Sequence, residues 1–181
     1  MNYKLYGNNT FTVEPVLSTE GRQQYINVTE KTGYHLATVN IGNDTHLLNL
    51  ELRNNSRVNI VDEDLAKIVW DKIRQFVPPV IGGQHALGLD TTFRCYRYNP
   101  GEYFNWHVDG ATKKDGNQSK FTILIYLNDE YTGGETEFEA NKVKGTPGGV
   151  LVFPHKTLHR GVEVAAGTKY VMRSDIMFGN I

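Results

Sequence analysis

The part of the chain that follows Thr92 consists of short runs in which apolar and polar residues alternate with a period of two. β-Branched and aromatic residues are frequent in them, and turn-forming pairs such as Pro100-Gly101 and Gly133-Gly134 separate them. The runs are TFRCYRY (residues 92–98), KFTILIYLN (120–128), GVLVF (149–153) and KYVMRSDIMF (169–178). No helical segment lies between them, so a parallel α/β sheet is not expected. The pattern predicts a mainly β fold of two sheets, a jelly roll, with helices packed outside it.

Two helices are predicted before this region. The first has Leu17 as a hydrophobic staple and Ser18 as its N-cap, and it extends towards Gly33. The second begins at Asp62 and ends before Pro78. Its apolar positions recur at helical spacing at Leu65, Ile68, Val69, Ile73 and Phe76. We therefore expect one domain over residues 1–181, with a helical support region at 1–90 and a β core at 91–178.

Composition excludes several classes of protein. Hydrophobic residues make up 39% of the 181 positions and charged residues 22%, which is typical of a globular domain. The formal net charge of −1 gives no basic surface for nucleic acid. No apolar run is long enough to span a membrane, and no signal peptide is recognisable. The single cysteine, Cys95, fits a reducing compartment, so we expect a cytoplasmic protein with no nucleic-acid or membrane partner. No feature specifies an oligomeric state.

Two histidines and an aspartate have the residue types and spacing of a metal site. His107 and Asp109 lie two positions apart in GEYFNWHVDG (101–110), so on a strand they would share one face. His159 follows in PHKTLHRG (154–161). Two imidazoles and one carboxylate on one face of an octahedral ion leave positions open, as in non-haem Fe(II) oxygenases. His155 competes with His159 as the third ligand, or adds a fourth.

The last predicted strand carries charges on a face that we expect to be buried. Lys169, Val171, Arg173 and Asp175 alternate along it and would point the same way. Burying these charges is costly unless each finds a partner. Arg173 and Asp175 can pair with each other. Lys169 then requires an anion, such as a small dicarboxylate that reaches the metal with its other end.

Four segments together resemble the 2-oxoglutarate- and Fe(II)-dependent dioxygenases, specifically the prolyl 4-hydroxylase-like branch. They are YNPGEYFNWHVDG (98–110), TILIYLND (122–129), GGETEF (133–138) and LVFPHKTLHRGVEVAAGTKY (151–170). The resemblance covers residues 92 to 178 and implies a double-stranded β-helix, a cupin-like jelly roll. It implies that Fe(II) is bound by His107, Asp109 and His159.

The same resemblance implies a co-substrate site. Lys169 would bind the distal carboxylate of 2-oxoglutarate, and Tyr98 and Tyr126 match tyrosines of the family's co-substrate pocket. Thr136 lies on the strand that closes over this pocket. Lysine in place of arginine matches the procollagen-type hydroxylases, and Arg173 is an alternative or additional anion ligand that we rank behind Lys169.

The resemblance implies hydroxylation of a C–H bond with O₂, while 2-oxoglutarate is decarboxylated to succinate and CO₂. Ascorbate is considered only as an accessory reductant. The branch favours a prolyl or other residue of a protein or peptide, or a free amino acid, as substrate. The segment RNNSR, with Arg53, Asn55 and Arg57, is either a substrate loop or a solvated loop that starts the second helix.

Two other classes remain open at this point. One is a cupin-like metal-dependent hydrolase or isomerase with the same three ligands. The other is a non-catalytic jelly-roll module with a structural metal, in which His155 completes a closed four-ligand site. Lys169 and Tyr98 speak against the first, and the orientation of His155 distinguishes the second.

Overall fold

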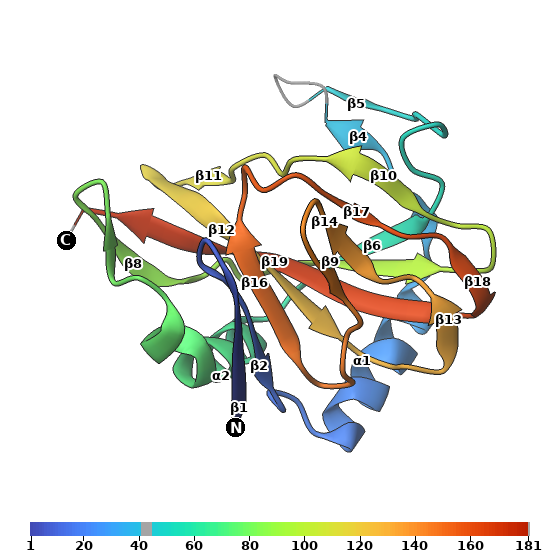
Figure 1. Ribbon diagram of the computed structural model, residues 1–181, viewed down its shortest axis with the longest axis horizontal. Coiled ribbons are helices and arrows are strands. Elements are labelled where there is room, and N and C mark those ends of the chain that lie inside the picture. The colour runs from blue at the N-terminus through green and yellow to red at the C-terminus, as the bar shows by residue number, and fades with distance from the viewer. Residues whose placement is uncertain (41–44, 181) are drawn as a thin grey trace.

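Two β-sheets lie face to face in the computed structural model, which describes residues 1–40 and 45–180 (Figure 1). Within these ranges the larger sheet has the order β1-β2-β16-β12-β19-β9-β6-β3, with β11, β8 and β7 paired at its margins. The smaller sheet has the order β10-β17-β14-β15. The two-sheet β fold predicted from the sequence is confirmed.

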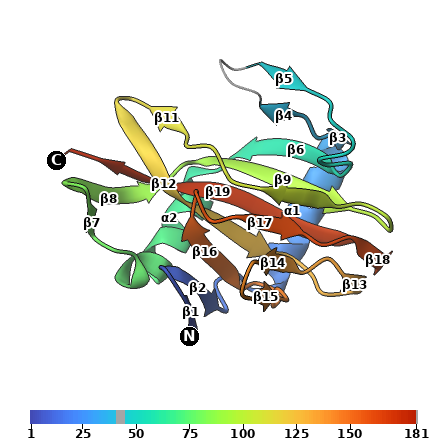
Figure 2. The ribbon, with the colours of Figure 1, turned by 45° about the horizontal axis from the view of Figure 1, so that its top comes forward.

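The bounds of the strands are as follows. The larger sheet contains β1 (Asn2–Gly7), β2 (Thr10–Glu14), β3 (His35–Leu36), β6 (Ser56–Val61), β7 (Val80–Ile81), β8 (Gln84–Leu89), β9 (Thr92–Tyr98), β11 (Lys113–Lys114), β12 (Asn117–Tyr126), β16 (Val150–Pro154) and β19 (Lys169–Gly179). The smaller sheet contains β10 (Phe104–His107), β14 (Thr136–Phe138), β15 (Lys142–Val143) and β17 (His159–Gly161). Two further pairs are β4 (Val39–Asn40) with β5 (His46–Leu47) and β13 (Tyr131–Gly133) with β18 (Val164–Gly167). The β4–β5 pair stands apart from the body of the molecule (Figure 2).

The period-two alternation of the central strands produces two separate cores. On β9, Phe93 and Cys95 join the core shared with the helices, whereas Tyr96 and Tyr98 face the space between the sheets. On β19, Met172 joins the first core. Because neighbouring residues of a strand point to opposite faces, the strand residues that line the inner space are fixed by the alternation. The functional residues therefore come from one set of alternate positions.

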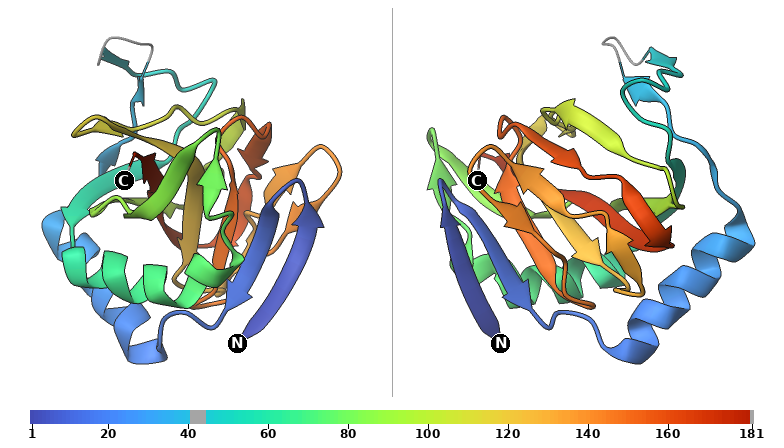
Figure 3. Two further views of the ribbon diagram at one scale, coloured as in Figure 1. Left: turned by 90° about the vertical axis from the view of Figure 1, so that its left-hand side faces the viewer. Right: turned by 45° about the vertical axis from the view of Figure 1, so that its right-hand side comes forward.

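Both predicted helices are confirmed, and they lie on the same side of the larger sheet (Figure 3). Helix α1 (Thr19–Thr32) is capped by Ser18, whose Oγ accepts from the Gly21 N–H at 3.1 Å. Helix α2 (Glu63–Ile73) is capped by Asp62, which accepts from the Leu65 N–H at 2.8 Å. A 3₁₀ turn, η1 (Arg74–Phe76), follows α2 before Pro78.

The first 90 residues contain more than the predicted helices. They supply β1 and β2, which extend the larger sheet beyond β16, and β6, which pairs with β9 along its length. The prediction omitted these strands, although Tyr3 and Leu5 in β1 and Phe11 and Val13 in β2 alternate with polar residues. Strand β1 is largely exposed. No helix within the described residues is long and apolar enough to cross a membrane.

The two isoleucines of α2 allow a matched test of how this helix packs against the core. Ile73 is fully buried, with 0% of its surface exposed, whereas Ile68 is 49% exposed although its spacing suggested burial. We expect Ile73→Ala to lower the free energy of unfolding by about 2–5 kcal/mol, since it leaves a cavity in the core. We expect Ile68→Ala to change it by less than about 1 kcal/mol. Urea denaturation followed by circular dichroism measures both, and equal losses would contradict the placement of α2.

Candidate metal centre

The two histidines with metal-ligand spacing are direct partners on neighbouring antiparallel strands. His107, the last residue of β10, pairs with His159, the first residue of β17. Their ring centroids are 4.2 Å apart. Residues that face each other across two antiparallel strands are brought together by the pairing itself, so the sheet register positions both rings.

Both imidazoles are oriented by the same local contact. Nδ1 of His107 lies 2.7 Å from the carbonyl oxygen of Asn105, and Nδ1 of His159 lies 2.9 Å from that of Thr157. A carbonyl only accepts, so in each ring Nδ1 carries the hydrogen and Nε2 has its lone pair free. This arrangement fixes the tautomer that binds a metal through Nε2.

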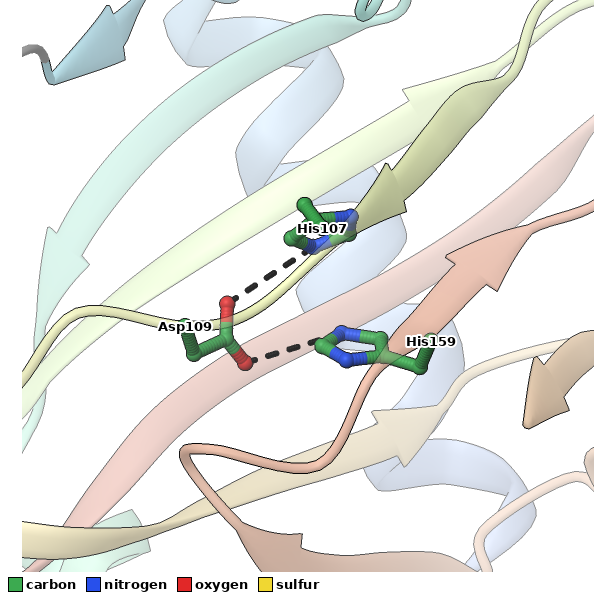
Figure 4. Close-up of side chains that lie close together, drawn as sticks. All are labelled: His107, Asp109 and His159. Carbon is green, nitrogen blue, oxygen red and sulfur yellow. Dashed lines mark ion pairs between the residues drawn. The ribbon is translucent and has the colours of Figure 1, made fainter. Parts of the chain in front are cut away.

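Asp109 completes the group, although it does not lie on the strand as the alternation argument assumed. Strand β10 ends at His107, and the chain turns so that the Asp109 carboxylate faces both rings (Figure 4). Its Oδ1 lies 3.7 Å from Nε2 of His107, and its Oδ2 lies 3.7 Å from Nε2 of His159. One ligand atom from each of the three residues can be chosen so that all lie within 4.8 Å of one another.

The protonation states of the group suit a divalent cation. Burial and then the neighbouring His159 lower the pKa of His107 to about 3, and burial lowers that of His159. Burial opposes ionisation of Asp109, but Arg173 and the two histidines outweigh it and lower its pKa to about 2. At neutral pH the group therefore offers two neutral nitrogens and one carboxylate, which is the donor set of the facial triad.

His155 is not part of the metal group. Its Nε2 lies 2.7 Å from Ser119 Oγ and its Nδ1 lies 2.9 Å from Thr122 Oγ1, so both ring nitrogens are engaged by hydroxyls. The group of possible metal ligands in the described part of the chain contains His107, Asp109 and His159. Residues 1–40 and 45–180 therefore form no closed four-ligand site of the structural kind here.

A pocket opens beside the three residues. Both Lys169 and Thr136 line it, and the Lys169 Nζ donates to the carbonyl oxygen of Gly134, two residues before Thr136, at 2.7 Å. The full lining is Tyr96, Tyr98, Phe104, His107, Asp109, Leu124, Thr136, His159, Gly161, Lys169, Val171 and Arg173. One pocket thus contains the metal group and both candidate anion ligands.

Lys169 is buried without a carboxylate partner among the ion pairs of residues 1–40 and 45–180. Only 3% of its surface is exposed, and its Nζ lies 5.1 Å from the centre of the Tyr98 ring. Burial lowers its pKa to about 8. An ammonium has three donors, and the Gly134 carbonyl accepts one of them. Lys169 is therefore a buried cation with donors left for an anion.

Arg173 differs from Lys169 because it already has anionic partners. Its Nη1 donates to Oδ1 of Asp109 at 2.8 Å, and its Nη2 donates to Oδ1 of Asp175 at 3.3 Å. Asp175 also binds Arg94, with a distance of 3.2 Å between Nη1 and Oδ2. The pairing of Arg173 with Asp175 that the sequence suggested is therefore present, and Asp109 is a partner that the sequence did not suggest.

Of the tyrosines and the threonine expected at the co-substrate site, some line the pocket and one lies behind the lining. Tyr98 and Thr136 line the pocket, whereas the lining formed by the described residues does not include Tyr126. Tyr126 is 1% exposed, its hydroxyl lies 2.8 Å from Thr136 Oγ1, and its ring centre lies 5.7 Å from the Lys169 Nζ. Tyr126 thus supports the pocket from behind.

The RNNSR segment is not a solvated loop, and it leads into β6 rather than into the second helix. Arg53 is 3% exposed and Asn55 is 0% exposed, and the Arg53 Nε donates to the Asn55 side chain at 3.0 Å. The Arg53 guanidinium lies 4.0 Å from the centre of the Phe104 ring, and that ring stacks on His107. Arg57 is half-buried and donates to Thr38. Arg53 therefore contacts the wall of the pocket from the far side of Phe104.

Sequence reasoning missed several lining residues. Phe104 and Gly161 face each other across β10 and β17, and Leu124 and Tyr96 come from β12 and β9. Tyr96 lies two positions before Tyr98, which the resemblance identified, so the alternation of β9 places both on one face and could have identified Tyr96. Phe104 has no such pattern, since β10 is four residues long.

Comparison with known proteins agrees with this geometry. The family described as the 2OG-Fe(II) oxygenase superfamily matches residues 93–174. The resemblance seen in the sequence is confirmed. Residues 93–174, less than half of the chain, thus resemble the 2OG-Fe(II) oxygenase superfamily.

Curated relatives match the same part of the chain. A PKHD-type hydroxylase of Synechococcus sp. (strain CC9605) is 31% identical over 81 residues, covering 41% of this chain and 36% of the relative. A putative prolyl 4-hydroxylase of Acanthamoeba polyphaga mimivirus is 33% identical over 97 residues, covering 41% of this chain and 40% of the relative. The matches thus span well under half the length of either relative.

Solved structures extend the likeness of fold to nearly the whole chain. The viral collagen prolyl hydroxylase of Paramecium bursaria chlorella virus-1, in its 2OG complex, has a TM-score of 0.68 at 23% identity. That match covers 94% of this chain and 97% of the viral one. A prolyl hydroxylase of Trichoplax adhaerens, in complex with a hypoxia-inducible-factor peptide, has a TM-score of 0.70 at 16% identity. That match covers 93% of this chain and 83% of the Trichoplax one. These structures establish the double-stranded β-helix fold predicted from the sequence.

A thermal-shift experiment tests the metal centre without any substrate. We expect Mn(II) or Co(II) to raise the melting temperature of the wild type and EDTA to reverse the shift, because a ligand at 100 times its Kd adds about 2.7 kcal/mol of stability. His107→Ala and His159→Ala should lose the shift. His85→Ala, an exposed histidine outside the centre, should retain it. Equal shifts in all three variants would place the metal elsewhere.

Proposed function

We propose that this chain is an Fe(II)- and 2-oxoglutarate-dependent dioxygenase that hydroxylates a C–H bond of a prolyl or other amino-acid residue. The observation that carries the proposal is the pairing of a two-histidine, one-carboxylate group with a buried, partly unsatisfied lysine in one pocket. The family match to residues 93–174 supports the same activity.

The three residues fit Fe(II) by donor type and protonation. His107 and His159 present free Nε2 atoms, and Asp109 is ionised. A triad on one face of the ion leaves coordination positions for a bidentate co-substrate and for O₂. When bound, Fe(II) supplies the oxidising chemistry by which O₂ and 2-oxoglutarate yield succinate, CO₂ and a hydroxylated substrate. No protein acid or base is required, so the residues act by binding and orientation.

Lys169 is assigned to the distal carboxylate of 2-oxoglutarate. It is the buried cation of the pocket that forms no ion pair with a carboxylate of the described residues. Arg173 is less suited because Asp109 and Asp175 already occupy its guanidinium. Tyr98 and Thr136 line the pocket near Lys169 and supply hydroxyls for the co-substrate, with Tyr126 holding Thr136 in place.

The substrate class is proposed from the relatives. Their names include PKHD-type hydroxylase and prolyl 4-hydroxylase, and one solved neighbour holds a peptide. A peptide or protein residue, or a free amino acid, is therefore our choice of substrate. A cupin-like hydrolase or isomerase is not favoured, because such an enzyme has no use for the buried Lys169.

Succinate formation tests the activity. With Fe(II), ascorbate as reductant and air, we expect the wild type to convert 2-oxoglutarate to succinate slowly without its prime substrate. His107→Ala should abolish turnover, because one of the three ligands is removed. Lys169→Ala should raise the KM for 2-oxoglutarate by 10-fold or more, since a charge-assisted contact is worth about 1.5–3 kcal/mol. The absence of both turnover and calorimetric 2-oxoglutarate binding by the metal-loaded wild type would overturn the proposal.

The affinity for 2-oxoglutarate should depend on the protonation of Lys169. Its pKa in the free protein, about 8, lies below the usual 10.5 because burial disfavours the charge. Only the charged amine attracts a carboxylate, so binding should be constant below pH 8 and weaken above it, by up to tenfold per pH unit. In Lys169→Arg the decline should disappear, because a guanidinium stays charged. Calorimetric titration from pH 7 to 9.5 measures both, and identical profiles would exclude Lys169 as the anion ligand.

A further inference from the structure

Asp109 belongs to a closed ring of polar contacts for which the proposed reaction has no use. The contacts between successive members are 2.6 to 3.3 Å long. In order, the members are Asp109, Thr122, His155, Ser119, Thr112, Asp175 and Arg173. They come from β12, from β19, from the segments that directly follow β10 and β16, and from the residue before β11. The ring therefore joins Asp109 to strands of the larger sheet that carry no metal ligand.

The direction of each hydrogen on one side of the ring can be assigned. The Asp109 carboxylate, paired with Arg173, only accepts, so the Thr122 hydroxyl at 2.6 Å must donate to it. A hydroxyl has one hydrogen, so Thr122 accepts from Nδ1–H of His155 at 2.9 Å. In neutral His155, Nε2 then accepts from Ser119 at 2.7 Å. Each hydrogen bond therefore points the same way: Ser119 donates to His155, which donates to Thr122, which donates to the carboxylate.

Main-chain hydrogen bonds also hold Asp109 and His155 in place. The N–H of Asp109 donates to the carbonyl of His155 at 2.9 Å, and the N–H of His155 donates to the carbonyl of Lys120 at 3.0 Å. Thr122 is 0% exposed and His155 is 5% exposed, so both side chains are closed off from bulk solvent. His155 therefore holds Asp109 both directly, through the main chain, and through the Thr122 hydroxyl.

We propose that Thr122 and His155 are positioning residues that fix the orientation of the Asp109 carboxylate. Arg173 occupies one lone pair of Oδ1 and Thr122 occupies one lone pair of Oδ2. The carboxylate cannot rotate about its Cβ–Cγ bond without breaking one of these contacts. Its remaining lone pairs stay available beside the two imidazoles, each 3.7 Å away. The inference rests on the proposed metal centre.

Calorimetric titration with Co(II) tests the role without any turnover. We expect Thr122→Val to weaken Co(II) binding by about 10-fold, as is typical when a contact to a metal ligand is lost. Thr122→Ser keeps the hydroxyl and should stay within about 3-fold of the wild type. The visible absorption of bound Co(II), which reports ligand geometry, should change in the valine variant and not in the serine variant.

Two variants of His155 test whether Thr122 needs a donor at the position of Nδ1 or only a polar side chain nearby. His155→Asn places an amide N–H near the position of Nδ1 and should keep most of the affinity. His155→Gln places its amide near the position of Nε2, leaves Thr122 without a donor, and should bind Co(II) about 10-fold more weakly. This pair also decides the question if Thr122→Val does not fold.

Thr29→Val is the matched control for loss of a buried threonine hydroxyl. Thr29 is 0% exposed, and its Oγ1 donates to the Tyr25 carbonyl within α1 at 2.8 Å. This variant should lower the melting temperature of the metal-free protein and leave the Co(II) affinity unchanged. Wild-type affinity in both Thr122→Val and His155→Gln would overturn the inference. A wild type that does not bind Co(II) would instead overturn the metal centre on which it rests.

Discussion

Charge burial between the two sheets is the constraint on which the site depends. Asp109, Asp175, Arg173 and Lys169 all lie in or beside an interior whose other walls are aromatic and aliphatic. Isolated charges there cost several kcal/mol each, so each must be compensated. Arg173 compensates both carboxylates at once, because it lies between them. Lys169 is the exception among the four, because it forms no ion pair with a carboxylate of the described residues, and the proposed function assigns it the distal carboxylate of 2-oxoglutarate.

The alternation of strand residues connects this constraint to the fold. On β19, Lys169 and Arg173 face the pocket, whereas Met172 faces the helices and completes the core beneath them. A one-residue slip of β19 would move the cations into the apolar core and the methionine into the pocket. The pairing of β19 with β12 on one side and β9 on the other opposes such a slip. The core thus maintains the register that the site needs.

The sequence predicted which residues form the site, but not the contacts that these residues make with one another. His107, Asp109, His159 and Lys169 were identified from spacing, alternation and resemblance, because local patterns carry that information. The pairing of Arg173 with Asp109 and the hydroxyl contacts of His155 could not be identified. They join positions far apart in the sequence, and their geometry depends on how three strands and two loops pack. Strand β1 was not predicted, and neither was the burial of the RNNSR segment, because both depend on tertiary contacts: the pairing of β1 with β2 and the packing of Arg53 on Phe104.

The position of β10 at the edge of the smaller sheet has a consequence for local stability. This four-residue strand pairs with β17 through an irregular register, and its other side has an isolated bridge, from Phe104 to Arg53. Such an edge opens more readily than the central strands. A cation held by His107 and His159 cross-links β10 to β17 at the point where the strand ends. Amide exchange in β10 and metal occupancy are therefore thermodynamically linked: bound metal lowers the opening equilibrium of the edge by the same factor by which opening weakens metal binding.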